Sequence, residues 1–297
     1  MIPRSFTQLA QTSRIKIAIV GRKTCHIEWM VRLKGHLNAR RYRSTAVIPP
    51  MSLHQRGLRR MPSVTGGRGL FAVTNFAAGD IIFTEQAALD SSLSWCRMKQ
   101  VFSKEAVMSA DCSDPIWSMV ANYLELCDQA LEDPRLLQRR ATVDSFYSPQ
   151  GTAPQEEPYN ALAKRMHEKM LPEARRLVSL DGLQAFMRNV RLNAHSVSML
   201  ISRTDVRGAV VNEGLGLFPL LHLTNHSCSP NAFFIATSLW SRSKQSDSAS
   251  MELRAAHNIA RGDEVVISYL VKPLLDEPAY IRRNSLLRDF GFDCLCE

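Results

Sequence analysis

The seven consecutive residues 225–231 read N-H-S-C-S-P-N and constrain this chain more than any other stretch. They place amide, imidazole, hydroxyl and thiol groups between two runs of apolar residues. Polar groups held between buried elements indicate a functional site, because loops on rigid scaffolds commonly carry chemistry. Asn225 and His226 are suited to hydrogen-bonding a polar small molecule. Cys228 has no evident partner base in the local sequence, so a metal ligand is a better interpretation than a nucleophile.

Three further segments accompany this stretch in a fixed order. They are Gly67-Arg68-Gly69-Leu70-Phe71-Ala72 before it, Gly262-Asp263-Glu264-Val265-Val266-Ile267-Ser268-Tyr269 after it, and Phe292-Asp293-Cys294-Leu295-Cys296 near the end. Together the four segments resemble the SET-domain protein lysine methyltransferases, particularly the SET-and-MYND branch. The resemblance covers about residues 63–90 and 190–297. It implies a mainly β fold with a helical insert (α+β), built of small curved β-sheets with a short post-SET tail.

The chain is expected to have three parts. Residues 1–62 form a basic N-terminal segment, residues 63–275 a SET domain with a helical insert at about 91–190, and residues 276–297 a post-SET segment that reads as truncated. The first segment carries a net charge of +12, whereas the rest of the chain carries −3. Three interpretations of residues 1–62 remain open. The segment could be a mitochondrial targeting segment or a basic arm that binds nucleic acid or an anionic surface. The third interpretation is a mispredicted start, with true initiation at Met51 or Met61.

Short apolar and β-branched runs predict strands on both sides of the insert. These runs are 70–73, 81–84, 253–256 and 264–269, with a turn at 78–80 and a polar loop at 238–250. A helix is expected over 276–290, with Ile281, Leu286, Leu287 and Phe290 facing inward.

The insert has a helical pattern. Asp114 can cap a helix that has Pro115 at its first position, and apolar residues follow at spacings of three and four from Ile116 to Leu131. A loop at 144–158 separates this helix from a second at about 159–178 and a third from Asp181.

The insert lacks the paired cysteine and histidine ligands that a MYND zinc module requires. Cys96, Cys112 and Cys127 occur singly in the sequence. We interpret all three as buried small side chains, and we expect no MYND module.

The resemblance implies S-adenosylmethionine as cofactor and assigns roles to individual residues. Those implied to contact the cofactor are Gly67, Arg68, Gly69, Asn193, Asn225, His226, Tyr269 and Phe292. Tyr269 is implied to be catalytic, with its hydroxyl near the reacting methyl group and amine. Phe292 would pack on the adenine. Asn193 would face the methionine part, although a polar residue in a turn explains it nearly as well, and His195 would then be a packing or surface residue.

Cys228, Cys294 and Cys296 match three of the four thiolates of the family's post-SET zinc site. The fourth would lie two residues beyond Cys296, and position 297 is the last one here. A truncated product, a ligand from elsewhere in the chain, and a site without zinc are the alternatives.

The implied activity is methyl transfer to a lysine of a protein substrate, histone or non-histone. The alternative is a non-catalytic SET-like module that binds a protein or peptide. Retention of Tyr269 together with Asn225 and His226 favours the enzyme.

Composition limits the setting of the chain. No apolar run approaches the ~18–20 residues that span a bilayer, so no membrane partner is expected. Nucleic acid is a candidate partner only through residues 1–62. Seven cysteines without a signal-peptide pattern favour an intracellular setting, with mitochondrial, nuclear and cytoplasmic locations not distinguished.

Overall fold

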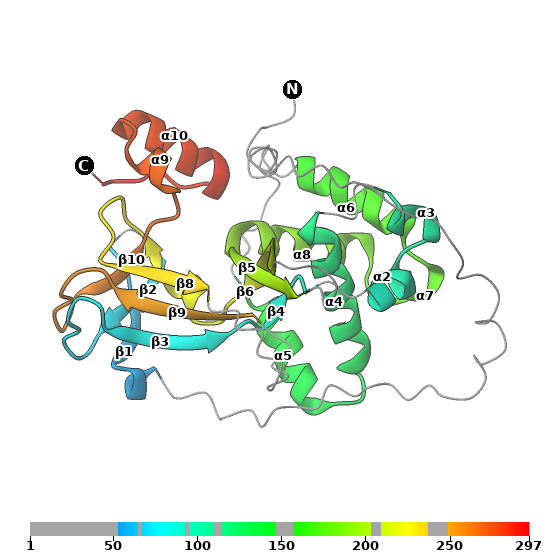
Figure 1. Ribbon diagram of the computed structural model, residues 1–297, viewed down its shortest axis with the longest axis horizontal. Helices are drawn as coiled ribbons and strands as arrows, with labels where there is room; N and C mark the ends of the chain where they lie inside the picture. Colours follow the sequence, from blue (N-terminus) through cyan, green and yellow to red (C-terminus); the bar gives the residue numbers. More distant parts are fainter. Residues whose placement is uncertain are drawn as a thin grey trace. The chain divides into compact units, whose positions relative to one another are not determined.

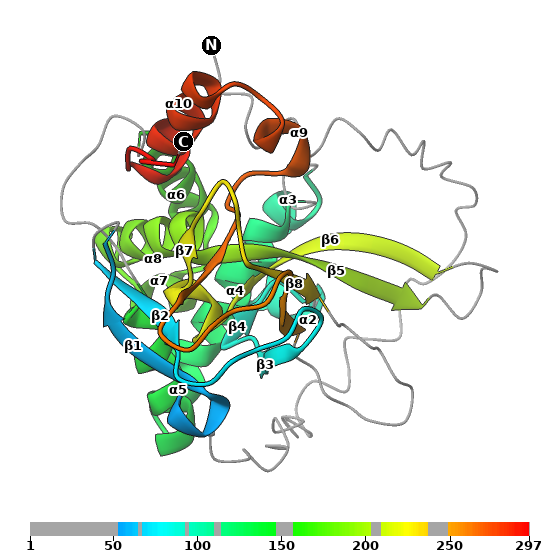
Figure 2. The same ribbon diagram turned by 90° about the vertical axis from the view of Figure 1, so that its left-hand side faces the viewer.

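Strands form three small sheets in the part of the chain that the computed structural model describes, residues 53–64, 67–92, 95–109, 114–146, 157–202, 209–236 and 249–296. In spatial order, the first sheet has β1 (Leu58–Pro62), β2 (Arg68–Ala72), β10 (Glu264–Ile267) and β7 (Asn225–His226). The second has β3 (Ile81–Gln86), β9 (Ser250–Ala255) and β8 (Ala232–Ala236). The third has β4 (Leu89–Asp90), β6 (Ala209–Leu217) and β5 (Ala194–Ser202), and its β5–β6 pair is the long hairpin of Figure 2.

Helices fill the interval between β4 and β5. They are α2 (Trp95–Val101), α3 (Lys104–Val107), α4 (Pro115–Gln129), α5 (Pro134–Asp144), α6 (Glu157–Lys169), α7 (Pro172–Leu177) and α8 (Leu180–Asn193). Figure 1 shows this helical insert on one side of the sheets. Two more helices, α9 (Lys272–Leu275) and α10 (Ala279–Phe290), follow the last strand. The predicted combination of small sheets with a helical insert is therefore confirmed. No helix in these described ranges has the length and apolar character to cross a membrane.

Local signals position most insert helices. The Asp114 side chain accepts a hydrogen bond from the Ile116 N–H and Pro115 begins α4, as predicted. The helix predicted over 159–178 is instead two helices, because Pro172 has no N–H to donate and its ring clashes with the preceding turn. Leu131 was predicted to be on the apolar stripe, but it lies past the end of α4 and is 73% exposed.

The prediction for the three insert cysteines is wrong in part. Cys127 is buried in α4, whereas Cys96 is exposed in α2. Cys112 lies outside the described residues.

Two buried cores lie on either side of the β4–β6–β5 sheet. The insert core includes Leu217 of β6, and the core of the other two sheets includes Val197 of β5. Buried hydrogen bonds also connect the two cores. Asn122 of α4 donates through Nδ2 to the Asp90 carbonyl (2.7 Å), and the Asp90 carboxylate accepts from the Ala249 N–H (2.7 Å). The insert is thus attached to the sheets by both packing and hydrogen bonds.

Strand β1 lies within residues 1–62, the segment expected to precede the domain. It pairs antiparallel with β2, and Leu58 is fully buried, so these residues take part in the folded unit. Before β1 comes a 3-10 turn, η1 (His54–Arg56). Residues 1–52 lie outside the described residues, and the interpretations of that part stay predictions.

The C-terminal helical segment differs in detail from the prediction. Leu286 is fully buried as expected, but Leu287 is 49% exposed because consecutive helical residues point about 100° apart. Leu286 packs with Leu270 and Cys294, and Tyr269, Cys228, Phe290 and Phe292 border this small cluster. The last helix therefore brings the end of the chain to the residues around Tyr269.

Candidate functional site

The N-H-S-C stretch enters the first sheet as the short strand β7. It runs parallel to β10, with Asn225 opposite Val266 and His226 opposite Ile267. The Ser227 N–H continues the pairing by donating to the Ile267 carbonyl (2.8 Å). Since β10 also pairs with β2, three of the motifs that are far apart in sequence meet across adjacent strands.

The Asn225 carboxamide is held from two sides. Its Nδ2 donates to the Arg68 carbonyl (3.3 Å) and to Oε1 of Glu264 (2.6 Å). The other carboxylate oxygen of Glu264 accepts from the Ser63 hydroxyl (2.8 Å), which comes just after β1. The Gly67–Gly69 segment and the Asn225 side chain are thereby joined, and their shared role in cofactor binding stays a prediction.

The two glycines of this segment are required for different reasons. Gly67 has a φ of 68°, and a Cβ there would meet nothing within 4 Å. At Gly69 a Cβ would lie 2.0 Å from Oε1 of Glu264 and 2.9 Å from Nδ2 of Asn225. The resemblance implies that these glycines contact the cofactor, and at Gly69 the space next to the backbone holds the Glu264 carboxylate.

Tyr269 follows β10 by two residues rather than lying on the strand as predicted. Its hydroxyl donates to the buried Thr224 carbonyl (2.7 Å). The ring packs beside Phe290 (centroids 5.0 Å apart), His226 (5.4 Å) and Phe292 (6.2 Å). Burial, and then the charge of Glu264, raise the pKa of Tyr269 to about 12. The phenol is therefore neutral at pH 7, and it orients groups rather than removing a proton.

His226 connects Tyr269 to the cysteines. Its Nδ1 accepts from the Tyr269 N–H (3.0 Å), and its Nε2 lies 3.3 Å from Sγ of Cys228. Burial, followed by the charge of Arg282, lowers the pKa of His226 to about 4, so the ring is neutral at pH 7. Because Nδ1 is the acceptor, the ring hydrogen is on Nε2 and faces the sulfur.

Three thiols gather at this end of the site. The Sγ atoms of Cys228 and Cys294 are 3.8 Å apart, and Sγ of Cys296 accepts from the Cys228 N–H (3.4 Å). With a ring nitrogen of His226, the ligand atoms all lie within 4.8 Å of one another. Burial raises the pKa of the Cys294 thiol to about 12, so a bound cation is what would ionise this thiol.

The donor set fits a thiophilic metal through its three sulfurs. The fit is weaker for the imidazole, because Nε2 can bind a metal only after its hydrogen moves to Nδ1, and that would break the bond from the Tyr269 N–H. The sequence left the fourth ligand open, and His226 in this tautomer does not supply it.

Phe292 and Asn193 differ in how the structure places them. Phe292 lies within the aromatic group, 6.0 Å from the His226 ring. Asn193 is buried at the end of α8, where its Nδ2 donates to the Asn189 carbonyl (2.8 Å). The cofactor-binding role of Asn193 stays a prediction. His195 packs against the ring of Phe234 (5.1 Å), as one of its expected roles required.

Sequence reasoning missed Glu264, Ser63, Thr224 and Phe290. Glu264 lies inside the segment Gly262–Tyr269, but nothing in that segment indicates its partner Asn225, which lies 39 residues away in sequence. The Thr224 carbonyl is a backbone group, so its residue type carries no signal.

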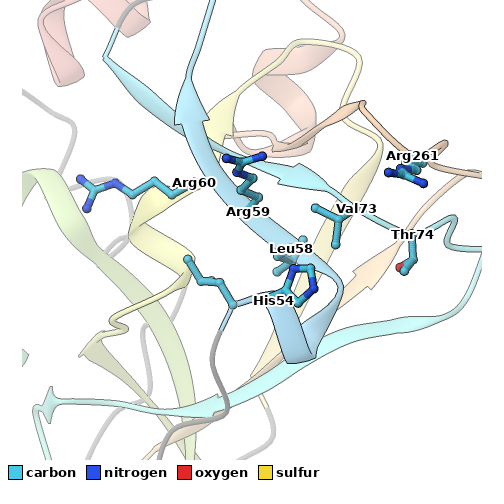
Figure 3. Close-up of a pocket in the computed structure, with 8 residues that line it drawn as sticks. His54, Leu58, Arg59, Arg60, Val73, Thr74 and Arg261 are labelled. Atoms are coloured by element: carbon cyan, nitrogen blue, oxygen red, sulfur yellow. The ribbon is translucent and has the colours of Figure 1, made fainter.

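A hollow of about 820 Å³ lies next to β1 and is separate from the predicted site. None of the predicted site residues lines it, and its lining includes Arg59, Arg60, Arg261 and His54. Figure 3 shows Arg60 and Arg261 extending toward opposite sides. These side chains do not converge on one point, and the hollow is not the candidate site.

Comparisons with known proteins show the family of this chain. The family model "SET domain" matches residues 67–270. The N-lysine methyltransferase SMYD2-A of Xenopus laevis is 26% identical over 81% of this chain and 60% of its own length. The SET and MYND domain-containing protein DDB_G0292454 of Dictyostelium discoideum is 30% identical over 39% of this chain and 31% of its own. The histone-lysine N-methyltransferase Smyd1 of Mus musculus is 37% identical over 28% and 17%.

The matches therefore span less than two thirds of each of these relatives. Among solved structures, the SET domain of LSMT bound to lysine and AdoHcy is 16% identical, with a TM-score of 0.45 over 80% of this chain and 53% of that one.

Proposed function

This chain belongs to the SET domain family, and on that basis we propose that it transfers a methyl group from S-adenosylmethionine to a lysine side chain of a protein. The observation that carries the proposal is the Tyr269 hydroxyl, bonded to the Thr224 carbonyl within a group of aromatic rings beside β7. Relatives named as lysine methyltransferases support the same class of substrate.

The cofactor would lie along Gly67–Gly69, Asn225 and Phe292. S-adenosylmethionine, when bound, supplies a methyl group on a positively charged sulfur. Asn225 has its carbonyl oxygen available, since its Nδ2 is bonded to Arg68 and Glu264. The half-buried ring of Phe292 offers a flat apolar face for the adenine.

The lysine amine must be neutral to react. A free lysine has a pKa of ~10.4, so its deprotonation at pH 7 costs about 4–5 kcal/mol. Apolar surroundings reduce this cost by disfavouring the charged form, and rings of Tyr269, Phe290 and Phe292 supply such surroundings. The proton passes to water as the amine enters. The Tyr269 oxygen, whose own hydrogen is donated to Thr224, can accept an amine N–H and align the nitrogen for the transfer.

We further propose that Cys228, Cys294 and Cys296 hold zinc. The metal would join the end of the chain, including Phe292, to the strand that carries Asn225 and His226. Structural zinc contributes directly to folding free energy, so loss of a ligand should loosen this end of the site.

Titration calorimetry of the full chain with S-adenosylmethionine tests the cofactor first. We expect binding by the wild type and its loss in Asn225→Ala. A Glu252→Ala variant is the matched control, because Glu252 lies in β9 and pairs with Arg254 instead of a site residue. The absence of binding by folded wild type supplied with zinc would overturn the proposal.

Transfer is then measured with a labelled methyl donor and a peptide library in which each member has a single lysine. A matched library carries arginine at that position. We expect label in the lysine library alone. Capture of lysine peptides without any label would instead support a non-catalytic binding module.

A further inference from the structure

Glu264 contacts three separate parts of the site. Its Oε1 accepts from Nδ2 of Asn225 (2.6 Å), and its Oε2 accepts from the Ser63 hydroxyl (2.8 Å). The carboxylate fills the space where a side chain at Gly69 would start. Strand β10, which carries Glu264, pairs with both β2 and β7, so the carboxylate bridges the two strands on either side.

These contacts decide which way the Asn225 carboxamide faces. Both neighbours of Nδ2, the Arg68 carbonyl and the Glu264 carboxylate, are hydrogen-bond acceptors. A reversed amide would set its carbonyl oxygen against two other oxygens, which would repel it. Both hydrogens of Nδ2 are thus used, and Oδ1 is directed away from Glu264. No described residue is seen to donate to that Oδ1.

We propose that Glu264 is a positioning residue that, by orienting Asn225, makes this point of the site select a ligand with a protonated amine. An outward carbonyl oxygen accepts hydrogen bonds and favours a cationic donor. The inference rests on the proposed function, in which the group concerned is the α-ammonium of the methionine part of the cofactor. Glu264 acts through Asn225 and does not itself touch the ligand.

Two ligands test this selection. S-adenosylhomocysteine carries the amine, and a synthetic analogue with a hydroxyl in its place does not. Calorimetry gives the affinity ratio of the two ligands for wild type, Glu264→Ala, Glu264→Gln and the control Glu252→Ala. We expect the wild type and Glu252→Ala to prefer the amine by about 10- to 100-fold, the range for a hydrogen bond to a charged group. Glu264→Ala should lose most of this preference.

Glu264→Gln separates orientation from charge. A glutamine oxygen can still accept from Asn225 while its amide donates to the Ser63 hydroxyl, so this variant should keep most of the preference. If Glu264→Gln loses as much as Glu264→Ala, the negative charge rather than the orientation of Asn225 acts on the ligand, and the inference is overturned. Unchanged preference in Glu264→Ala overturns it as well.

Thermal unfolding shows whether each variant is folded. If Glu264→Ala is not, Ser63→Ala replaces it, since this change releases only one carboxylate oxygen. The amine preference should then fall by about two- to fivefold, and an unchanged preference would refute the role of Glu264. Failure of folded wild type to bind either ligand is a different result, because it removes the proposed cofactor and not only the role of Glu264.

Discussion

Replacement of Gly69 by alanine should disturb the site through a side chain that is distant in sequence. The new Cβ would lie 2.0 Å from Oε1 and 2.8 Å from Cδ of Glu264. A carboxylate is the end of a flexible side chain, so it can rotate away without moving the backbone. It would then lose its hydrogen bonds to Asn225 and Ser63.

The magnitude follows from those two bonds. A hydrogen bond to a charged group contributes about 1.5–3 kcal/mol, with the lower end appropriate to these partly exposed groups. In a strand, alanine is more stabilising than glycine by about 0.5–1 kcal/mol, which offsets part of this loss. We therefore expect Gly69→Ala to lower the free energy of unfolding by about 2–2.5 kcal/mol, measured by urea titration with an unchanged denaturant slope.

A double-mutant cycle with Glu264→Ala identifies the cause. With the carboxylate gone, alanine at position 69 has lost its main clash, and the cost of the double variant should be smaller than the sum of the two single costs. Gly67→Ala is the matched comparison, because its cost comes from its φ of 68° with no atom nearby. The losses of stability from Gly67→Ala and Glu264→Ala should therefore add in the double variant. Additivity in both pairs, or wild-type stability of Gly69→Ala, would refute the reasoning.

Three more predictions concern Tyr269, Glu85 and Cys294. Tyr269→Phe leaves the buried Thr224 carbonyl without its donor. We therefore expect the free energy of unfolding to fall by about 1–2 kcal/mol and the rate of labelled methyl transfer to fall about 100-fold. A wild-type rate of transfer would contradict the role assigned to Tyr269. Burial raises the pKa of Glu85 from 4.5 to about 7, although hydrogen bonds from two backbone N–H groups lower it. Between these two pH values the folded protein keeps a proton on Glu85 that the unfolded chain releases. The free energy of unfolding therefore falls as the pH rises from 4.5 to about 7. Between about pH 5 and pH 7.5, urea titrations should show a decrease in the free energy of unfolding that is about 1–3 kcal/mol smaller for Glu85→Gln than for the wild type. An equal decrease in the two proteins would contradict this prediction. Emission spectrometry should find about one zinc per wild-type chain and none in Cys294→Ser, whereas equal content would exclude Cys294 as a ligand.

Local features were predictable where neighbouring residues determine them. The Asp114–Pro115 start of α4 depends on atoms within one turn, and the short strands β2, β3 and β9 follow from their own residue types. The errors lie where a partner is distant. The exposure of Cys96 and Leu287 depends on which helix face meets a neighbour, and sequence spacing leaves that choice open.

Strand β1 is a further example. Its residues Arg59 and Arg60 resemble the basic segment before them, and only pairing with β2 assigns them to the sheet. An edge strand with exposed charged side chains has little hydrophobic signal, because one neighbour and one buried leucine are enough to hold it.

The sequence by itself determined the family, the order of its motifs and the chemical groups of the candidate site. Tertiary structure decided which atoms of those groups remain available. Glu264 leaves the Asn225 oxygen outward, the Tyr269 N–H occupies Nδ1 of His226, and the Thr224 carbonyl takes the Tyr269 hydroxyl hydrogen. A side chain's donors and acceptors are set by its residue type, but which of them are used depends on partners that only the folded chain brings within hydrogen-bond distance.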